Sequence, residues 1–567
     1  MVRQMAPKKV KQRGQTAWKT STSTKARRKC VALFSCLALL LCYCPFEAGA
    51  AREFAAAQSR LKRNVTSTQP FLVPLPKEYT RGTEIIVVSP LLQFSSNFPE
   101  SRVLRTAFDA FHPLIFVHPI RPATDPTLQV LLEVEVSVLS RNEELQFGVD
   151  ESYEIEVPAD GSKAIIRGKT VFGARHGIET FSQLCVYDYG LRAVKIENAP
   201  WRIFDEPRFP HRGILIDTAR HWQPVKVLKA LIDSFSYAKI NVIHWHLVDM
   251  QSFPIEIPSF PRLWDGAWSE FERYTTRDMQ DIVEYSRLRG INIMPEIDVP
   301  GHAESWGVGY PQLWPHPDCR QPLDMSTDFT WEVIRGIIDD LLKIFPYKYF
   351  HAGGDEVNVD CWSQVPRTKR WLDAHNRTGM QAYADFVVRT QEMLLERGRD
   401  PVNWEEPFDS FPERLNKNGV VHVWLDNPQT ISQATQHGFP VIVANTAGSY
   451  LDHLDIVWRS IYMNDPYKGI KREAQRRLVI GGENCMWGED IDASDLEQTI
   501  WPRAAAFAER YWSPVNHTEG YQNVERFLPR YHYFRCLLNQ RGVRAAPAAN
   551  HLARKNPDGP GSCYEQR

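Results

Sequence analysis

The sequence lacks a surplus of either charge: 67 Lys and Arg stand against 68 Asp and Glu, so the formal net charge is −1. Nucleic-acid-binding chains normally carry a basic surplus, so this balance argues against a nucleic-acid partner. Beyond residue 50 the chain also lacks an apolar run long enough to cross a membrane. Apolar residues make up 43% and charged residues 24%, which is a globular composition and excludes wholesale disorder.

The first fifty residues have the features of a secretory signal. A basic stretch ending at Lys29 is followed by an apolar run, Val31 to Phe46, and by the small residues Ala48–Ala50. We therefore predict that residues 1–50 are a signal peptide with a basic N-terminal extension. The alternative is an uncleaved signal anchor, the one case in which the chain would stay attached to a membrane. Residues 51–69, rich in Ala, Ser and Thr, are predicted to be a linker.

No cysteine after the signal belongs to a C-x-x-C pair, which argues against a zinc cluster. In the oxidising secretory pathway, cysteines favour structural disulfides. The six that remain are Cys185, Cys319, Cys361, Cys485, Cys536 and Cys563. Three sequons, at Asn64, Asn376 and Asn516, are predicted glycosylation sites. These features predict the secretory pathway, with secretion, the lysosome or vacuole, and the cell surface as alternative destinations.

Residues 70–205 alternate between apolar and polar residues with a period of two, which is typical of strands. Ala159-Asp160-Gly161 supplies a hairpin turn between two of them. We predict a small α+β domain with helices on one side of its sheet. Its predicted strands are 84–88, 128–138, 153–157 and 164–166, and its helix is 170–184.

Residues 206–567 follow a different rhythm, in which short apolar strands alternate with amphipathic helices. One example is the buried run 213–216, then a helix opened by Pro224, then the strand 241–248. Such alternation predicts parallel pairing, and the number of repeats is near eight, so we predict a (β/α)8 TIM barrel. An open doubly wound sheet is the alternative, but no Gly-x-Gly-x-x-Gly turn follows the first strand.

Carboxylates and aromatic residues dominate the positions just after the predicted barrel strands. Active sites of such barrels lie at this end of the strands. Neither a serine elbow nor a thiol nucleophile fits these positions, whereas paired carboxylates with stacking aromatics favour glycosidic chemistry. The positions are Arg220, Asp249, Glu296, Asp298, His302, Asp355, Glu356, Trp404, Glu405, Trp424, Tyr450, Asp452, Trp487 and Glu489.

The most specific segment is His351-Ala-Gly-Gly-Asp-Glu356. Its glycines let the backbone approach the barrel mouth closely. Two adjacent carboxylates repel each other, so we expect the pKa of one to rise, as a general acid requires. A solvated acidic turn is the alternative, but it fits the flanking glycines and aromatics poorly.

This segment resembles the signature of the β-N-acetylhexosaminidases of glycoside hydrolase family 20. The resemblance covers roughly residues 70–563, including the small N-terminal domain. It extends through four further motifs in the same order, which are 213–221, 241–249, 295–302 and 481–489.

The resemblance implies an exo-acting, retaining and substrate-assisted mechanism. Glu356 would protonate the glycosidic oxygen, and the 2-acetamido oxygen of the sugar would attack the anomeric carbon. Asp355 would hold the acetamido N–H beside the developing positive charge. The products would be terminal N-acetylglucosamine or N-acetylgalactosamine, released from a glycan or chitooligosaccharide.

Further roles are implied residue by residue. Arg220 and Glu489 would bind the sugar 3- and 4-hydroxyls, while Tyr450 would donate to the acetamido oxygen and Asp452 would bind the 6-hydroxyl. Asp249 and His302 would form the polar chain behind the acid. The residues that would wall the acetamido pocket are Trp404, Trp424 and Trp487. Taken singly, each tryptophan could equally be barrel-end packing and Arg220 a structural ion pair.

The resemblance also implies the disulfides Cys319–Cys361 and Cys536–Cys563, with Cys185 and Cys485 free. It implies neither a metal nor a cofactor, and because dimers are common among such enzymes, a homodimer is among its implications.

Two other classes compete with the glycosidase. His244-x-His246 places two imidazoles on one strand face near Glu296, a pattern that can bind zinc in a metal-dependent hydrolase. Hydrogen-bonded core histidines are the favoured interpretation of this pair. The other class is a non-catalytic glycan-binding protein, against which the retained Asp355–Glu356 pair argues.

Overall fold

The computed structural model describes residues 69–120 and 128–548. The predicted signal segment, the predicted linker apart from Gln69, Asn64 and Cys563 lie outside these ranges. Within them, none of the helices combines the length and hydropathy that crossing a bilayer needs.

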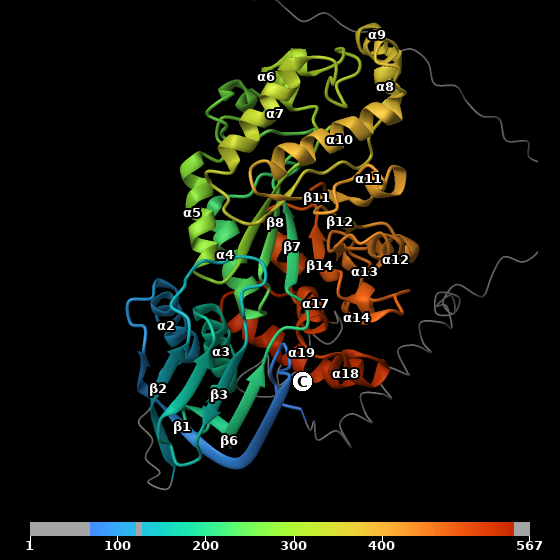
Figure 1. Ribbon diagram of the computed structural model, residues 1–567. Coiled ribbons are helices and arrows are strands. Elements are labelled where there is room, and N and C mark those ends of the chain that lie inside the picture. Colours follow the sequence, from blue (N-terminus) through green and yellow to red (C-terminus); the bar gives the residue numbers. More distant parts are fainter. Residues whose placement is uncertain (1–68, 121–127, 549–567) are drawn as a thin grey trace, which may run out of the picture. The chain divides into compact units, whose positions relative to one another are not determined.

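The small domain is a six-stranded mixed sheet with the order β1-β2-β4-β3-β6-β5 and an additional pairing between β1 and β6. β3 and β4 pair antiparallel, so the predicted hairpin is confirmed. Helices α2 and α3 pack beside the sheet, and Thr170 caps α3 by accepting from the Gly173 amide (Figure 1). The strands are β1 (Glu78–Ser96), β2 (Gln129–Val138), β3 (Tyr153–Val157), β4 (Ala164–Gly168), β5 (Val186–Asp188) and β6 (Ala193–Asp205). The helices are α2 (Arg102–Ile115) and α3 (Val171–Leu184).

Three elements of this domain, α2, β5 and β6, escaped the sequence prediction. The buried residues of α2 recur at helical spacing, from Val103 and Leu104 through Ala107 to Phe111 and Ile115, so a signal was present. β6 contains Pro200, which lowers the strand signal because proline cannot donate a backbone hydrogen bond. It is nevertheless held between β1 and β3 by antiparallel pairing.

The larger part is a closed barrel in which each strand pairs in parallel with its neighbours, in the order β10-β11-β12-β13-β14-β7-β8-β9. The predicted TIM barrel is thereby confirmed. β7, β8 and β9 are buried along their whole length, as is typical of the strands of a parallel barrel. The strands are β7 (His211–Asp217), β8 (Val242–Val248), β9 (Asn292–Ile297), β10 (Tyr349–His351), β11 (Asp400–Trp404), β12 (Val420–Val423), β13 (Val441–Val443) and β14 (Val479–Met486).

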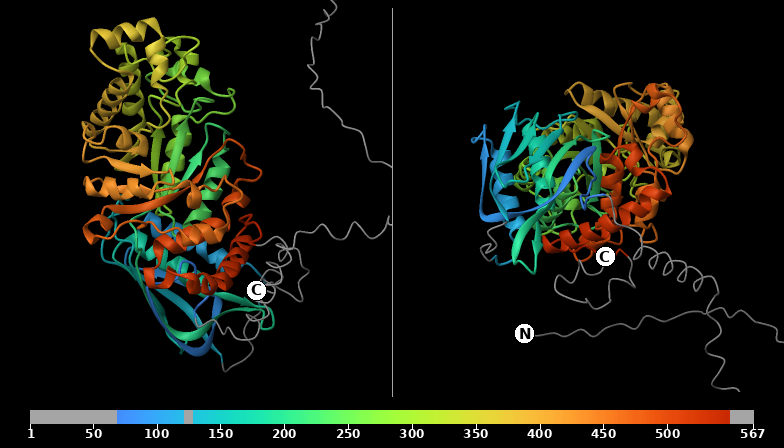
Figure 2. Two further views of the ribbon diagram at one scale, coloured as in Figure 1. Left: turned by 90° about the vertical axis from the view of Figure 1, so that its right-hand side faces the viewer. Right: turned by 90° about the horizontal axis from the view of Figure 1, so that it is seen from below.

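Helices surround the barrel, and the C-terminal helices α17 and α19 run beside the small domain (Figure 2). A capping box formed by Thr275 and Asp278 opens α5. The main helices are α4 (Val225–Tyr237), α5 (Thr276–Arg287), α7 (Asp328–Leu341), α8 (Val359–Gln364), α9 (Pro366–Ala374), α10 (Gly379–Leu395), α11 (Glu405–Ser410), α12 (Pro428–Gln436), α14 (Trp458–Met463), α17 (Arg503–Trp512) and α19 (Tyr521–Gln540). Shorter turns, α6 (Trp306–Gly309), α13 (Thr446–Ser449), α15 (Glu473–Arg476), α16 (Leu496–Ile500) and α18 (Val515–Thr518), lie between them.

The small domain covers the N-terminal ends of the barrel strands through buried ion pairs. Arg212, at the start of β7, contacts the Glu151 carboxylate at 2.5 Å, and the same carboxylate lies 3.0 Å from His176. Lys239 Nζ lies 3.4 Å from Asp205 Oδ2. We call these five side chains the base. Because the base lies at the N-terminal ends of the strands, the opposite, carboxyl-terminal ends are open for a site.

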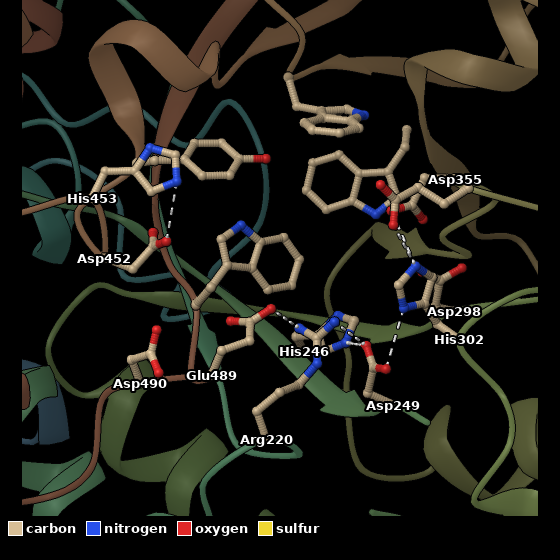
Figure 3. A pocket seen from close by; sticks show the side chains of 15 residues that line it. Arg220, His246, Asp249, Asp298, His302, Asp355, Asp452, His453, Glu489 and Asp490 are labelled. Atoms are coloured by element: carbon tan, nitrogen blue, oxygen red, sulfur yellow. Dashed lines mark hydrogen bonds and ion pairs between the residues drawn. The ribbon is translucent and has the colours of Figure 1, made fainter. Parts of the chain in front are cut away.

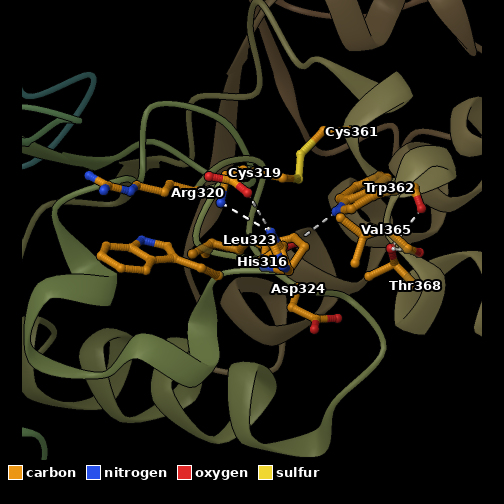
Figure 4. Close-up of a disulfide and its surroundings, with 12 residues drawn as sticks. His316, Cys319, Arg320, Leu323, Asp324, Cys361, Trp362, Val365 and Thr368 are labelled. Carbon is orange, nitrogen blue, oxygen red and sulfur yellow. Dashed lines mark hydrogen bonds and ion pairs between the residues drawn. A yellow bond between two sulfur atoms is a disulfide. The ribbon is translucent and has the colours of Figure 1, made fainter.

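A disulfide joins Cys319, in the loop before α7, to Cys361 of α8, as the family resemblance implies (Figure 4). Beside it, Trp362 Nε1 donates to the Leu323 carbonyl at 3.0 Å. Cys185 and Cys485 are buried free thiols. Cys536 is disulfide-bonded, but its predicted pairing with Cys563 stays a prediction because Cys563 lies outside the described residues.

Candidate active site

A pocket of about 390 Å³ opens at the carboxyl ends of the barrel strands. The eleven predicted catalytic, substrate-binding and acid-supporting residues all line it, although they come from the ends of eight different strands. They are Arg220, Asp249, His302, Asp355, Glu356, Trp404, Trp424, Tyr450, Asp452, Trp487 and Glu489. His246, Asp298, His453 and Asp490 complete the lining. Figure 3 shows Asp452 and His453 on one side of the pocket and Asp355 with His302 on the other.

The backbone after β10 is shaped to present Asp355 and Glu356. Gly353 has φ +57°, and a Cβ there would lie 1.9 Å from Asp298 Oδ1, so only glycine fits. Glu356 itself has φ +48° and His302 has φ +49°, conformations that cost energy for residues other than glycine. Such strain concentrates where a side chain must be aimed at a particular point.

A chain of alternating charges lies behind Glu356. His302 contacts Asp249 Oδ1 through Nδ1 at 3.2 Å and Glu356 Oε2 through Nε2 at 3.4 Å. Asp249 Oδ2 in turn lies 2.8 Å from His246 Nε2. Burial alone would lower the pKa of His302, but Asp249 and the other carboxylates outweigh it and raise the pKa to about 12. His302 is therefore a fixed cation beside the pair Asp355–Glu356.

The sequence predicted a raised pKa for one of the pair Asp355–Glu356, but the raised pKa belongs to the neighbouring Asp298. Burial, followed by the charge of Asp355, raises the pKa of Asp298 well above its ordinary value. The hydrogen bond from His302 holds the pKa of Glu356 below its ordinary value instead. Its side chain is 61% exposed, so in the free chain solvent and His302 favour its charged form.

Arg220 lies at the pocket floor, where it is held by three carboxylates. Its Nη1 contacts Asp217 at 2.9 Å and Glu489 at 3.5 Å, and its Nη2 contacts Asp249 at 2.8 Å. Burial opposes its charge, but these carboxylates raise its pKa above the ordinary value. The guanidinium also lies over the Trp487 ring at 5.1 Å, so the predicted hydroxyl-binding pair Arg220 and Glu489 is preassembled.

Aromatic rings form the pocket walls, and two of the indoles are tethered. Trp404 Nε1 donates to Glu296 Oε1 at 2.9 Å. Trp424 Nε1 donates to both oxygens of Glu406, at 3.1 and 3.0 Å. A buried indole N–H normally needs such a partner. Both walls are therefore fixed by carboxylates that are not part of the pocket lining.

Two carboxylate oxygens in the pocket can each accept a hydrogen bond from a ligand. Oδ1 of Asp355 and Oδ1 of Asp452 are buried and have no hydrogen-bond partner within the described chain. Burial raises the pKa of Asp452 to about 6, and His453, 3.7 Å away, opposes this rise. An unpaired buried acceptor is costly, so each oxygen favours a ligand N–H or O–H.

The His244–His246 pair, which competed as a zinc site, is enclosed by carboxylates. His246 lies between Glu296 and Asp249, and His244 lies 2.9 Å from Glu483 and 3.0 Å from Glu296. Burial opposes protonation, yet these carboxylates raise the pKa of His244 to about 9 and that of His246 to about 10. A protonated imidazole has no lone pair for a metal, so the arrangement supports the hydrogen-bonded interpretation.

The sequence analysis assigned no role to Asp298 or Glu406, although both influence the site. Asp298 Oδ1 accepts from the Gly354 amide at 2.8 Å and so shapes the turn that carries Asp355. Its position at a strand end was a usable signal. Glu406 had a weaker one, because only the folded chain brings it to the Trp424 indole.

Comparison with known proteins agrees with this geometry. Residues 209–515 match the model of the glycosyl hydrolase family 20 catalytic domain, and residues 72–184 match that of a beta-acetyl hexosaminidase like domain. The chain is 48% identical over 512 residues to Beta-hexosaminidase 1 of Arabidopsis thaliana, covering 88% of this chain and 94% of that protein. It is 34% identical to the mouse Beta-hexosaminidase subunit beta, covering 84% and 92%.

Among solved structures, the chitobiase of Flavobacterium johnsoniae superposes with a TM-score of 0.75 at 28% identity, covering 87% of this chain and 76% of that one. A family match over more than half of the chain, together with these relatives, establishes the family. The chain therefore belongs to glycosyl hydrolase family 20 and is a glycoside hydrolase.

Proposed function

We propose that this enzyme removes terminal, non-reducing β-linked N-acetylglucosamine or N-acetylgalactosamine from glycans, with retention and with the substrate's own acetamido group as nucleophile. The observation that carries the proposal is the pair Asp355–Glu356 beside the fixed cation His302, in a pocket walled by tethered tryptophans. The similarity to proteins named β-hexosaminidases supports the same activity.

In the first step the acetamido oxygen attacks the anomeric carbon, the glycosidic bond breaks, and Glu356 gives its proton to the leaving oxygen. Because the nucleophile is part of the substrate, the attack gains from proximity. The unpartnered Oδ1 of Asp355 is suited to accept the acetamido N–H, and its charge offsets the positive oxazolinium ion that forms. Water deprotonated by Glu356 then attacks the anomeric carbon and reopens the ring.

The exposed position of Glu356 gives substrate binding a role in setting its pKa. A leaving group seated over this carboxyl would remove it from water, and desolvation raises the pKa of a carboxyl. Protonation of the acid would thus depend on an occupied site, while the free enzyme holds Glu356 charged beside His302.

We further propose that the chain reaches this substrate through the secretory pathway, with glycans at Asn376 and Asn516, whose side chains are exposed. We also propose, from the family resemblance, that the enzyme forms a homodimer. Sizing of the purified enzyme before and after glycan removal would test both.

The decisive test pairs turnover with binding. We expect hydrolysis of an aryl β-N-acetylglucosaminide and tight inhibition by N-acetylglucosamine thiazoline, which imitates the cyclised intermediate. Hydrolysis without thiazoline inhibition would contradict substrate assistance, and persistent inactivation by a chelator with recovery on zinc would favour the metal-dependent class.

A further inference from the structure

Glu296, at the end of β9, is a buried carboxylate on which two parts of the active site converge. Its Oε1 accepts the indole N–H of Trp404 at 2.9 Å. Its Oε2 accepts from His246 Nδ1 at 2.5 Å. Glu296 is 0% exposed and is not part of the pocket lining, so it acts through other residues rather than on a substrate.

The contacts of Glu296 with Trp404 and His246 lead to two different functions of the pocket. Trp404 is a wall of the proposed acetamido site. His246 holds Asp249, which holds His302, the cation that contacts Glu356. One carboxylate therefore joins the surface that would receive the nucleophile to the chain that supports the acid.

Both oxygens of Glu296 are engaged by these hydrogen bonds. Two more imidazole nitrogens lie close to it: His351 Nδ1, which itself accepts from the Gly353 amide, is 3.0 Å from Oε1, and His244 Nε2 is 3.0 Å from Oε2. A carboxylate offers about four acceptor sites on its two oxygens. An amide of the same shape can accept at one end only, so it must give up either the tryptophan or the histidine arm.

We propose that Glu296 is a positioning residue that fixes the Trp404 wall and the His246–Asp249–His302 chain relative to each other. The inference rests on the proposed function, since it names what aligns the nucleophile with the acid. A misalignment of about 1 Å can cost about 10²-fold in rate, which sets the scale of the expected effect.

Glu406 provides a matched control. It tethers the other wall, Trp424, through both oxygens, but none of its recorded contacts reaches His246 or Asp249. Glu406→Gln should therefore disturb the Trp424 wall and leave the chain from His246 to His302 in place, so KM should rise with little change in kcat. Glu296→Gln should lower kcat by about 10²-fold and also weaken thiazoline binding.

A pH profile separates positioning from a general loss of packing. The charged groups that face His246 are Glu296 from β9 and Asp249 from the loop after β8, while the Trp487 ring packs edge-on. Removing the Glu296 charge leaves one anion, so His246 would lose its proton at lower pH. We expect the alkaline limb of kcat to move to lower pH in Glu296→Gln and to stay in place in Glu406→Gln.

The experiment measures kcat, KM, pH dependence and thiazoline affinity for the wild type, Glu296→Gln, Glu406→Gln, Trp404→Phe and the double variant Glu296→Gln/Trp404→Phe. Trp404→Phe keeps an aromatic ring in the wall but replaces the indole by a smaller ring and removes the N–H. If Glu296 positions Trp404, its loss and that of the N–H are not additive in thiazoline affinity.

A folded Glu296→Gln with wild-type kcat and an unmoved alkaline limb would overturn the inference, as would additive losses in the double variant. If Glu296→Gln does not fold, Glu296→Asp decides, because it keeps the charge but withdraws the oxygens by one methylene: a lower kcat with several-fold weaker thiazoline binding supports positioning, and wild-type values overturn it. An inactive wild type would instead refute the proposed function, which these comparisons distinguish.

Discussion

The two ends of the barrel are built from the same kinds of side chain and behave differently. At the base, Glu151 is paired with Arg212 and His176 and is buried. At the mouth, Asp355 and Asp452 lie beside the imidazoles of His302 and His453, yet each keeps one unpartnered oxygen facing a pocket. Charge pairing that is complete stabilises a fold, whereas pairing that is left incomplete around a cavity creates a site.

The pKa shifts follow this difference. At the base, burial would raise the pKa of Glu151, but Arg212 and then His176 lower it to about 2. At the mouth, burial and like charge raise the pKa of Asp298, and burial raises that of Asp452 to about 6. The same carboxyl group thus titrates several pH units apart, according to whether a cation fully compensates its burial.

The largest expected effect is a loss of turnover at the mouth of the barrel without a loss of thermal stability. Glu356→Gln removes the proposed acid but no buried pair, so turnover of substrates with poor leaving groups should fall by about 10²- to 10⁴-fold while thermal stability stays near wild type. Kinetics on chitobiose and a melting curve check this. Near-normal cleavage of chitobiose would reject the assignment.

Removing the neighbouring charge should act on the transition state. We expect Asp355→Asn to lower kcat by about 10²- to 10³-fold with a modest change in KM, because the carboxylate matters most when positive charge develops. Steady-state kinetics with an aryl glycoside measure both constants. A large rise in KM at constant kcat would mean that Asp355 only binds the ground state.

The base should respond in the opposite way. Glu151→Leu leaves Arg212 buried without its anion, which should lower the free energy of unfolding by about 3–5 kcal/mol while kcat of the folded enzyme persists. Denaturant unfolding followed by fluorescence measures the loss. An unchanged midpoint would show that the base is not a stabilising cluster.

Acid should weaken the base through the same group. The folded pKa of Glu151 is depressed, so its contribution is fully present above the unfolded pKa of about 4.3 and is lost as pH falls towards 2. His176, whose pKa burial lowers to about 4, adds to this loss because the unfolded chain takes up its proton first. Stability measured between pH 7 and pH 2 should decline less steeply in Glu151→Leu.

The disulfide at the mouth should contribute a smaller term. Replacing Cys319 and Cys361 by serine opens a connection of 42 residues, and we expect a loss of about 2–4 kcal/mol in the chain-entropy account. Unfolding of the oxidised wild type and the double variant under equal conditions measures it. Free thiols at both positions in non-reduced wild type would contradict the bond.

The smallest effect concerns substrate charge. Asp452 would accept a 6-hydroxyl but repel a 6-sulfate, so kcat/KM should favour the neutral sugar by about tenfold. Because the pKa of Asp452 is about 6, the disadvantage should shrink as pH falls below 6 and Asp452 becomes neutral. Aryl glycosides with and without the sulfate measure the ratio, and no gain for the sulfated sugar in Asp452→Asn would disprove the contact.

Much of the fold was predictable because local patterns were strong. The helical stripe of α4 and the alternation of β3 and β4 each repeat a period that only one regular structure satisfies. β6 was missed because a strand containing Pro200 and Asn198, which has φ +61°, is held by pairing with β1 and β3 rather than by its own propensity.

The sequence by itself determined the barrel, the small domain and the identity of the residues at the strand ends, because period and motif order are properties of the chain. Only the tertiary structure decided which side chains contact one another. The tether from Glu296 to Trp404 spans 108 positions, and the pKa of Glu356 is lowered by His302, which lies on another strand end. Such effects depend on the distances between atoms and on their burial. The interactions weaken over a few ångströms, and the spacing of residues along the sequence does not reveal them.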